Sequence, residues 1–399
     1  MTVLLLVGIG VAWWIMTPAE RTRVYRSAWA FAGKAKDVAL EEHRDPFHAA
    51  LRERSRFVFV TPALVALNLL VFVGMFLGPA PLSAPETQLN WGASFGPRTT
   101  NGEWWRLLTA LFVHGGALAL IVNMAALVQP ALILERLAGR LALAAVYFAA
   151  GLLTMTVSLS AHPVDVSTGA SGAVYGIYGL LVVSCAWGLV RRSPVTVPLR
   201  AFKTLAPPAA LFIAYNAATR GFANGPDLAG LLTGVVAGFA IASRFNEEQA
   251  PAGRVATVMG VCAVVILACV FPLRGLANVR PEIDRLVSLE DQTARSYDSA
   301  VALFQKGRIN RSALAQVIDR TILPELEKAA ARLQALRRVP QEQQSLVASA
   351  EEYLRLRDQS WRLRAEALQK SNMATLRQAD RREQASLELF ERVKAATQN

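Results

Sequence analysis

Cysteine and histidine are scarce in this chain of 399 residues. The three cysteines, Cys185, Cys262 and Cys269, all lie in long uncharged runs, which favours buried free thiols. Neither cysteine nor histidine occurs at the spacing typical of a structural zinc site. We therefore expect no disulfide framework, no metal site and no cofactor.

Charged residues are also few, at 18% of the chain, whereas 53% of residues are hydrophobic and the mean hydropathy is +0.31. A helix needs about 20 apolar residues to cross a bilayer, and within lipid its backbone amides must be satisfied internally. The sequence therefore predicts an all-α, polytopic membrane protein with seven or eight spans. The uncharged runs are 1–19, 57–80, 107–134, 141–164, 166–190, 204–219, 228–243 and 255–273.

The first of these runs is the doubtful span. It lacks the basic start of a signal peptide, and it carries a tryptophan pair, Trp13 and Trp14, that suits a membrane interface. Basic residues follow it. We expect a membrane helix with its N-terminus outside, and a cleaved signal peptide remains the alternative.

The distribution of basic residues predicts the orientation. Seventeen lysines and arginines lie in 20–56, 135–140, 191–203 and 244–254, whereas 81–106 and 220–227 hold three, Arg98, Arg106 and Arg220. Cytoplasmic loops carry the excess of basic residues, so the first set is predicted to be cytoplasmic and Arg274 onward to lie outside. This topology explains most of the net charge of +12, and no nucleic-acid partner is expected.

The region 276–399 differs in composition, because acidic and basic residues alternate with a helical apolar pattern. Breaks at Gly307 and Pro340 predict three helices, at about 282–306, 311–338 and 342–394. Arg357 and Arg364 interrupt the seven-residue repeat of the last one. Both a self-contained helical bundle and a coiled-coil or dimer contact fit this pattern. The apolar positions are Ile322, Leu326, Ala329, Leu333 and Leu336, then Leu354, Trp361 and Leu368.

Ser171 lies in Gly169-Ala170-Ser171-Gly172, at the start of an uncharged run. Small neighbours leave room for close approach to its hydroxyl, as a nucleophile requires. The same residues also suit helix packing, because Gly172 and Gly176 form a G-x-x-x-G pair. The motif by itself leaves both interpretations open.

Other features appear around this serine in a fixed order. Gly102-Glu103-Trp104-Trp105-Arg106 precedes a span that holds His114 and Asn123, and a glycine stripe follows the serine-bearing span. This ordered set resembles the rhomboid intramembrane proteases from about Phe57 to Ser243. The stripe consists of Gly230, Gly234 and Gly238.

The resemblance implies a serine hydrolase with a two-residue Ser–His centre inside the membrane. In that family Ser171 would be the nucleophile and Asn123 an oxyanion donor, while Tyr175 would stack against the base. Trp105 and Arg106 would brace the helices at the membrane surface. Gly169, Gly172 and the glycine stripe, Gly230, Gly234 and Gly238, would serve close packing.

Two positions depart from the family pattern. Ala119 replaces a histidine of the oxyanion site, and Asp227 stands where the base histidine belongs. A carboxylate is a weak base for an alcohol, and Pro226-Asp227 also reads as the first turn of a helix. The four histidines are His43, His48, His114 and His162, and none lies in the glycine-striped span.

We therefore expect a rhomboid-like protein that binds transmembrane clients with absent or strongly impaired hydrolysis. The alternatives are an active endopeptidase that uses Ser171 with an unusual base, and a structural protein whose serine only packs. The predicted regions are 1–56, a basic segment with the first span; 57–245, the six-span core; 246–275, an added span; and 276–399, a tail able to self-associate. The location is predicted to be a bacterial inner (cell) membrane.

Overall fold

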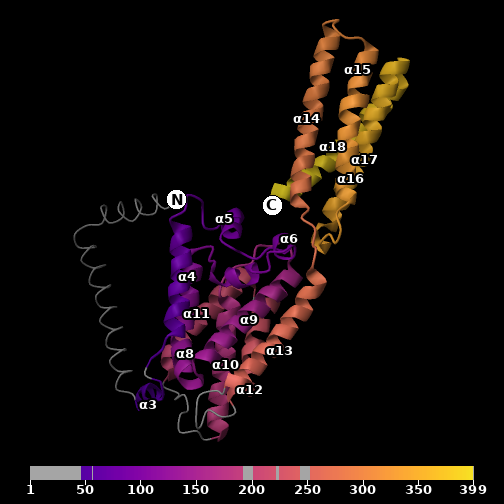
Figure 1. Cartoon of the computed structure of the whole chain (residues 1–399). Helices are drawn as coiled ribbons and strands as arrows, with labels where there is room; N and C mark the ends of the chain where they lie inside the picture. The colour runs from indigo at the N-terminus through magenta and orange to yellow at the C-terminus, as the bar shows by residue number, and fades with distance from the viewer. Residues whose placement is uncertain (1–45, 56, 192–200, 222–223, 243–251, 399) are drawn as a thin grey trace, which may run out of the picture. The chain divides into compact units, whose positions relative to one another are not determined.

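The computed structural model describes residues 46–55, 57–191, 201–221, 224–242 and 252–398. The run 1–19 and His43 lie outside these residues, so the expectations for them have no structural counterpart. The chain separates into two compact units, Met1–Leu273 and Arg274–Asn399. Figure 1 shows helices throughout the described parts of both units, which confirms the all-α fold class.

The described part of the first unit contains eleven α-helices and two 3-10 turns. The long helices α8, α9, α10, α11 and α12 gather around a common core, and α13 packs mainly against α9 (Figure 1). The bounds are α3 Pro46–Arg54, α4 Val60–Phe76, α5 Pro85–Asn90, α6 Gly96–Thr99, α7 Arg106–Thr109, η1 Ala110–Phe112, α8 Ala117–Ala138, α9 Arg140–Ala161, α10 Ser171–Arg191, α11 Phe202–Arg220, α12 Gly225–Ala242, α13 Ala252–Val270 and η3 Phe271–Leu273.

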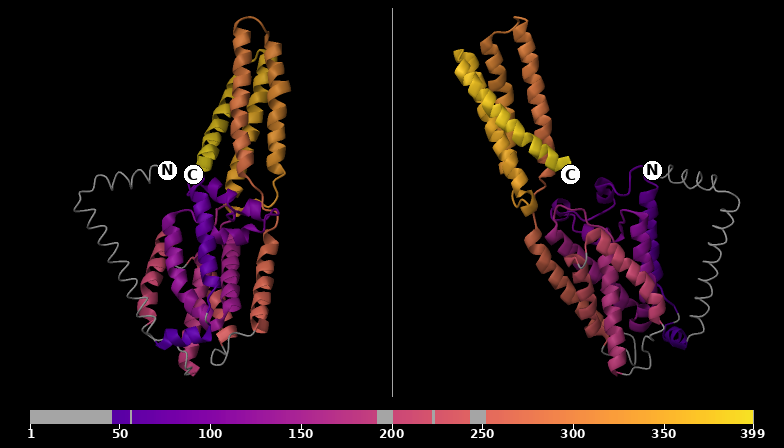
Figure 2. Two further views of the ribbon diagram at one scale, coloured as in Figure 1. Left: turned by 60° about the vertical axis from the view of Figure 1, so that its left-hand side comes forward. Right: turned by 180° about the vertical axis from the view of Figure 1, so that it is seen from behind.

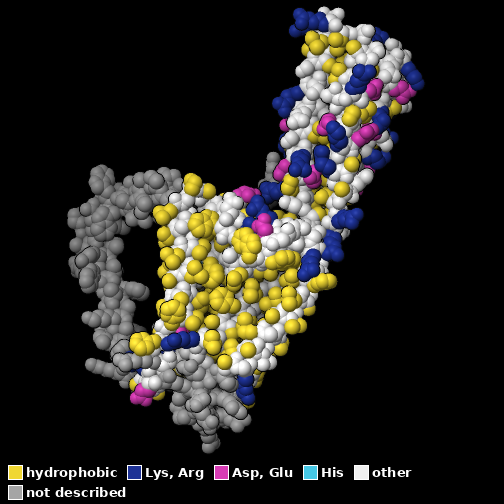
Figure 3. Space-filling model, viewed as in Figure 1, with side chains coloured by type: hydrophobic (Ala, Val, Ile, Leu, Met, Phe, Trp, Pro, Cys, Tyr) yellow, Lys and Arg dark blue, Asp and Glu magenta, His cyan; other side chains and the backbone are white. Residues whose placement is uncertain are grey.

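Three described segments are long and apolar enough to cross a membrane: Ala117–Ala138, Arg140–Ala161 and Ala252–Leu273. Three shorter apolar helices accompany them, Val60–Phe76, Ser171–Trp187 and Gly225–Ile241. α11 is less apolar because it carries Lys203, Asn216 and Arg220. Hydrophobic side chains nevertheless cover the face of this unit seen in Figure 3.

Two of the predicted spans, α8 and α10, begin well after the start of their uncharged runs. The run 107–134 forms the short turns α7 and η1 first, and α8 starts only at Ala117, because Val113 and Gly116 are extended. The run 166–190 likewise starts with extended backbone, and Ser167 pairs with Ser94 in an isolated β-bridge. The segments before α8 and before α10 are therefore non-helical, and both lie on the side of the unit where α10 begins.

Glycines bring α10 and α12 into close contact. A Cβ added at Gly234 would lie 1.9 Å from the carbonyl oxygen of Gly176, and one at Gly230 would lie 2.3 Å from that of Gly172. A Cβ at Gly238 would lie 2.8 Å from Cβ of Val183. Only hydrogen fits between these backbones, so the glycine stripe sets the distance between the helices that carry Ser171 and Asp227.

A buried carboxylate fixes the start of α4. Glu135 of α8 accepts hydrogen bonds from the backbone N–H groups of Phe59, Val60 and Thr61 at 2.6, 2.8 and 2.8 Å, and from the Thr61 hydroxyl at 2.7 Å. The first N–H groups of a helix have no partner within the helix. Glu135 supplies that partner from a distant part of the chain.

The second unit is a bundle of four antiparallel helical rods, which Figure 2 shows side by side from two directions. The elements are α14 Arg280–Gln305, α15 Arg311–Val317, η4 Ile318–Ile322, α16 Leu323–Gln334, α17 Gln341–Lys370 and α18 Met373–Gln398. A π-helical turn, η4, joins α15 to α16 within one rod. The apolar stripe from Ile322 to Leu333 is buried in this bundle.

The prediction of one helix over 342–394 is wrong. The chain reverses at Ser371, which adopts a left-handed conformation with φ of 55°. Asn372 then caps the next helix, since its Oδ1 accepts from the backbone N–H of Ala374 at 2.9 Å. The reversal folds α18 back along α17. Arg357, which interrupts the seven-residue apolar repeat of α17, is therefore buried between helices.

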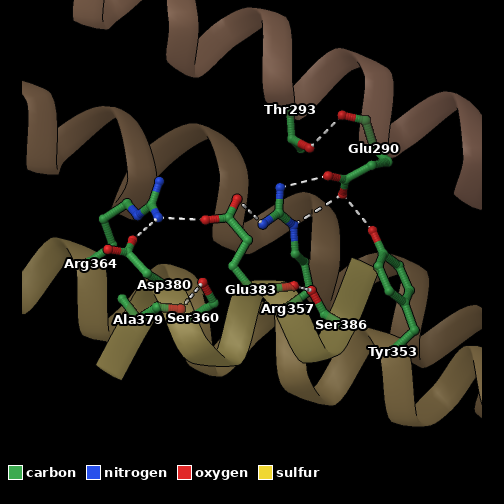
Figure 4. A network of polar contacts seen from close by, with 10 residues as sticks. All are labelled: Glu290, Thr293, Tyr353, Arg357, Ser360, Arg364, Ala379, Asp380, Glu383 and Ser386. Carbon is green, nitrogen blue, oxygen red and sulfur yellow. Dashed lines mark hydrogen bonds and ion pairs between the residues drawn. The ribbon is translucent and has the colours of Figure 1, made fainter. Parts of the chain in front are cut away.

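Arg357 is the centre of a network of buried charges (Figure 4). Its guanidinium donates to Glu290 of α14 at 2.6 Å and to Glu383 of α18 at 2.6 Å. Tyr353 donates its hydroxyl to Glu290, and Arg364 binds Asp380 and Glu383. Buried charges are tolerated when they are paired and hydrogen-bonded, so this network ties α14 and α18 to α17.

Candidate active site

Ser171 is the first residue of α10, and its side chain is buried. The chain enters α10 through Gly169, whose φ of +102° is a conformation that side chains strongly disfavour. The backbone N–H of Gly169 donates to the carbonyl of Ala110 at 2.9 Å. This turn places the Ser171 hydroxyl at the end of the helix, beside the ends of α11 and α12.

Two charged groups hold the hydroxyl of Ser171. Its Oγ donates to Oδ1 of Asp227 at 3.0 Å and accepts from Nη1 of Arg220 at 2.7 Å. Asp227 is 4% exposed, whereas the side chain of Arg220 is 41% exposed. The structure thus brings Asp227, which the resemblance predicts at the position of the base, into direct contact with Ser171.

Asp227 also lies in the first turn of α12, as the sequence suggested. Its backbone N–H donates to Oδ1 of Asn224 at 2.9 Å, and the Asn224 amide donates to Oδ2 of Asp227 at 3.0 Å. This reciprocal arrangement closely resembles a capping box. Asn224 therefore caps α12, and the Asp227 carboxylate accepts from the capping side chain and from Ser171 at the same time.

Sequence reasoning missed Arg220 as part of the site and counted it only among the outer basic residues. It ends α11, its Nη2 donates to the carbonyl of Thr168 at 2.8 Å, and its Nη1 lies 3.9 Å from Oδ1 of Asp227. No short motif marks such a residue. The available signal was an arginine at the end of a predicted span, seven residues before Asp227.

The predicted oxyanion donor is engaged elsewhere. The side-chain amide of Asn123 donates to the carbonyl of Ala119, one turn earlier in α8, at 2.7 Å. Asn123 is buried, and its Oδ1 has no hydrogen-bond partner among the described residues. The structure therefore does not bring the Asn123 amide to Ser171.

The described histidines do not supply a base at Ser171. His114 is buried before α8, with its Nδ1 3.3 Å from the carbonyl of Phe112. His162 is exposed at the end of α9. Within the described ranges no group of three His, Cys, Asp or Glu residues could hold a metal ion.

Two cavities flank the serine. The larger, of about 340 Å³, is polar; the smaller, of about 150 Å³, is mainly apolar, and it lies between α11 and α12 next to Tyr175. The ring of Tyr175 packs against Phe212 of α11, with 4.8 Å between ring centroids. The polar cavity is lined by Thr154, Met155, Ser158, His162, Asp165, Val166, Ser167, Thr168, Arg220, Asn224 and Pro226. The apolar cavity is lined by Tyr175, Ile213, Ala217, Gly221, Asn224, Asp227, Leu228 and Leu231.

Trp105 and Arg106 make their contacts with the segment around α5 and α7. Arg106 is buried, and it donates to the carbonyls of Leu89 and Ala93 and pairs with Glu103. Its guanidinium lies 4.6 Å from the ring centroid of Trp105, which is 52% exposed. These contacts tie the segment after α5 to the start of α7.

Comparisons with known proteins agree with this architecture. Residues 101–244 match the Rhomboid domain. Over 145 residues the chain is 32% identical to the rhomboid protease GluP of Bacillus subtilis, covering 36% of this chain and 28% of that protein. It is 25% identical over 214 residues to rhomboid-like protease 3 of Toxoplasma gondii, covering 53% of this chain and 77% of the relative.

A relative described as inactive is also similar. Over 117 residues the chain is 31% identical to the inactive RHOMBOID-like protein 8 of Arabidopsis thaliana, covering 28% of this chain and 32% of that protein. The chain thus spans less than a third of the length of two of these three relatives. The match contains Ser171, Arg220 and Asp227, and together with the helical membrane fold it shows that this chain belongs to the rhomboid family.

Proposed function

We propose that this protein uses a rhomboid scaffold to bind transmembrane segments and that it cuts them slowly or not at all. The observation that carries the proposal is the state of the Ser171 hydroxyl, which donates to Asp227 and accepts from Arg220. A serine nucleophile needs an adjacent general base. Here the partner is a carboxylate that also accepts from Asn224, the capping residue of α12.

The expected loss of rate is large. Without an imidazole base an enzyme of this kind loses roughly 10²–10⁴-fold in rate, and removal of one oxyanion donor removes roughly 10²–10³-fold. Ala119 cannot donate a side-chain hydrogen bond, and the Asn123 amide is bound to its own helix. Arg220 adds a further obstacle, because its hydrogen bond occupies a lone pair of the attacking oxygen.

The second candidate is an active endopeptidase with Asp227 as the base. The 3.0 Å hydrogen bond from Ser171 to Asp227 favours it, since a base must reach the proton that it removes. In that case Arg220 would stabilise the developing negative charge on oxygen. The two candidates differ in whether Ser171 is nucleophilic.

A fluorophosphonate probe measures that nucleophilicity without knowledge of the substrate. We expect the purified protein to be labelled no more than its Ser171→Ala variant, while an active rhomboid protease is labelled in parallel. Asp227→His combined with Ala119→His should increase labelling if the scaffold keeps the family geometry. Clear labelling of the unmodified protein that disappears in both Ser171→Ala and Asp227→Ala would instead establish the second candidate.

The surroundings of the protein follow from the same proposal. It is a multi-pass integral membrane protein, and we propose a bacterial inner membrane with transmembrane proteins as clients and the tail on the outer side. A reporter fused after Asn399 should then be accessible from outside the cell membrane. The tail helices are also proposed as a site of self-association, which cross-linking within α17 or α18 would detect.

A further inference from the structure

Arg220 links the ends of three helices at the candidate site. It ends α11, donates to Ser171 at the start of α10 and to the carbonyl of Thr168 just before it, and lies 3.9 Å from Asp227 of α12. Both of these hydrogen bonds go to neutral oxygens. A guanidinium has five donors, and it binds carboxylates through two parallel charge-assisted bonds that are roughly twice as strong as neutral ones.

Asp227 does not depend on Arg220 for its hydrogen bonds. Its Oδ1 accepts from Ser171 and its Oδ2 accepts from Asn224. The contact between Arg220 and Asp227 is an ion pair at 3.9 Å without a hydrogen bond. Arg220 can therefore take another acidic partner while the carboxylate of Asp227 keeps two hydrogen bonds.

The two cavities give a foreign group access to this arginine. The apolar cavity between α11 and α12 is lined by Ile213, Ala217 and Leu228, among others, which suits the apolar side chains of a membrane-spanning segment. Arg220 lines the polar cavity next to it, and its side chain is 41% exposed. Asp165 lines the polar cavity too, but it is exposed, so solvent screens its charge.

We propose that Arg220 selects clients by binding an aspartate or glutamate at the outer end of their transmembrane segment. The proposal rests on the client-binding function above. The client would enter beside the apolar cavity and exchange the neutral partners of Arg220, Ser171 and Thr168, for its own carboxylate. An acidic side chain near the bilayer strongly needs such a partner, since an unpaired charge there is costly.

The test uses the purified full-length protein in nanodiscs of zwitterionic phosphatidylcholine and three single-span peptides of one sequence. The peptides carry Asp, Asn or Lys at one position near the outer end, and fluorescence energy transfer measures their binding. We expect the Asp peptide to bind at least roughly tenfold more tightly than the Asn peptide, as a charge-assisted hydrogen bond implies. Arg220→Met should abolish this preference, Arg220→Lys should keep part of it, and Arg220→Glu should shift it to the Lys peptide.

Arg98→Met is the matched control, because Arg98 is an outer arginine in a surface ion pair with Glu86, away from the serine. It should leave the preference unchanged. Equal binding of all three peptides would overturn the role of Arg220 and leave client binding standing, whereas no binding by any peptide would overturn both. A preference that requires added phosphatidylglycerol, and not the client's acid, would assign Arg220 to lipid and also reject the proposal.

Discussion

The membrane unit and the tail bundle hold their helices together by opposite means. Between α10 and α12 the contact consists of glycines, with Gly234 facing the backbone of Gly176. Between α14, α17 and α18 the contact includes Arg357 with two carboxylates, surrounded by large side chains such as Trp361. Figure 3 shows the same contrast on the surface, where hydrophobic groups cover one unit and charges are spread over the other.

The difference has a physical origin. Lipid does not drive apolar helices together, so close approach of small residues must supply the attraction in a membrane. In water, burial of apolar area drives association, and a buried ion pair can add specificity to that contact. Within the membrane unit, the pair of Arg220 and Asp227 lies at the site, beside Ser171.

The largest effect is expected from Arg357→Met in the tail. This change leaves Glu290 and Glu383 without their buried cation, and removal of one partner of a buried pair typically costs about 3–5 kcal/mol. Hydrogen exchange should increase in peptides of α14, α17 and α18 and stay unchanged in α10 and α12. Arg355→Met, which removes an exposed ion pair on the same helix, is the control and should have little effect.

Gly234→Leu tests the membrane side of the comparison. Overpacking of a tight contact typically costs about 1–3 kcal/mol and sometimes more, and here the obstacle is backbone, which cannot rotate away. We expect the melting temperature in detergent to fall by several degrees more than it does for Ser171→Ala. Gly253→Leu in α13 is the control, because a Cβ there meets no atom within 4 Å. Equal small shifts for both leucine variants would show that the glycine stripe is not a packing face.

Acid should loosen the tail before the membrane unit. Burial acts to raise the pKa of Glu383, but hydrogen bonds and charge from Arg357 and Arg364 outweigh it and lower the pKa below the ordinary value of 4.5. A depressed pKa stabilises the fold above the unfolded value, and that contribution is lost as pH falls through the folded value. Near-ultraviolet circular dichroism should detect loss of tail packing below pH 4.5. Glu383→Gln should make the near-ultraviolet signal of the tail less dependent on pH. If the variant loses that signal at acid pH as the unmodified protein does, the prediction is contradicted.

The smallest effect is expected from Asp227→Ala. If Asp227 mainly holds the capping side chain of Asn224 at the start of α12, its loss should cost about 0.5–2 kcal/mol, as other lost caps do. Asp165→Ala, in the loop between α9 and α10 where the side chain is exposed, should cost less. Thermal melts of the two variants give the comparison. A loss with Asp227→Ala as large as that with Gly234→Leu would mean that the Ser171–Arg220–Asp227 contacts stabilise the unit far beyond a cap.

The sequence was a good guide wherever one strong physical requirement acts along the chain. Long uncharged runs predict membrane helices because lipid cannot satisfy backbone amides, and the starts of α9, α11, α12 and α13 lie within three residues of the starts of their runs. The sequence was a poor guide where one or two polar residues reverse the direction of the chain. The reversal at Ser371 and Asn372 was hidden in a helical pattern, because neither residue excludes a helix by itself.

The sequence by itself determined the helical membrane fold and the rhomboid resemblance, and the resemblance led to the prediction that Ala119 and Asp227 stand where the family has histidines. Only the tertiary structure decided that Arg220 and Asp227 both contact Ser171, and that Asn123 turns its amide toward Ala119. Hydrophobic periodicity predicts which face of a helix is apolar, but it does not predict which helix ends lie next to one another. The contact of Arg220 with Ser171 joins residues 49 positions apart, and it exists because close packing of α10 against α12 and of α11 against α8 brings the ends of these helices together.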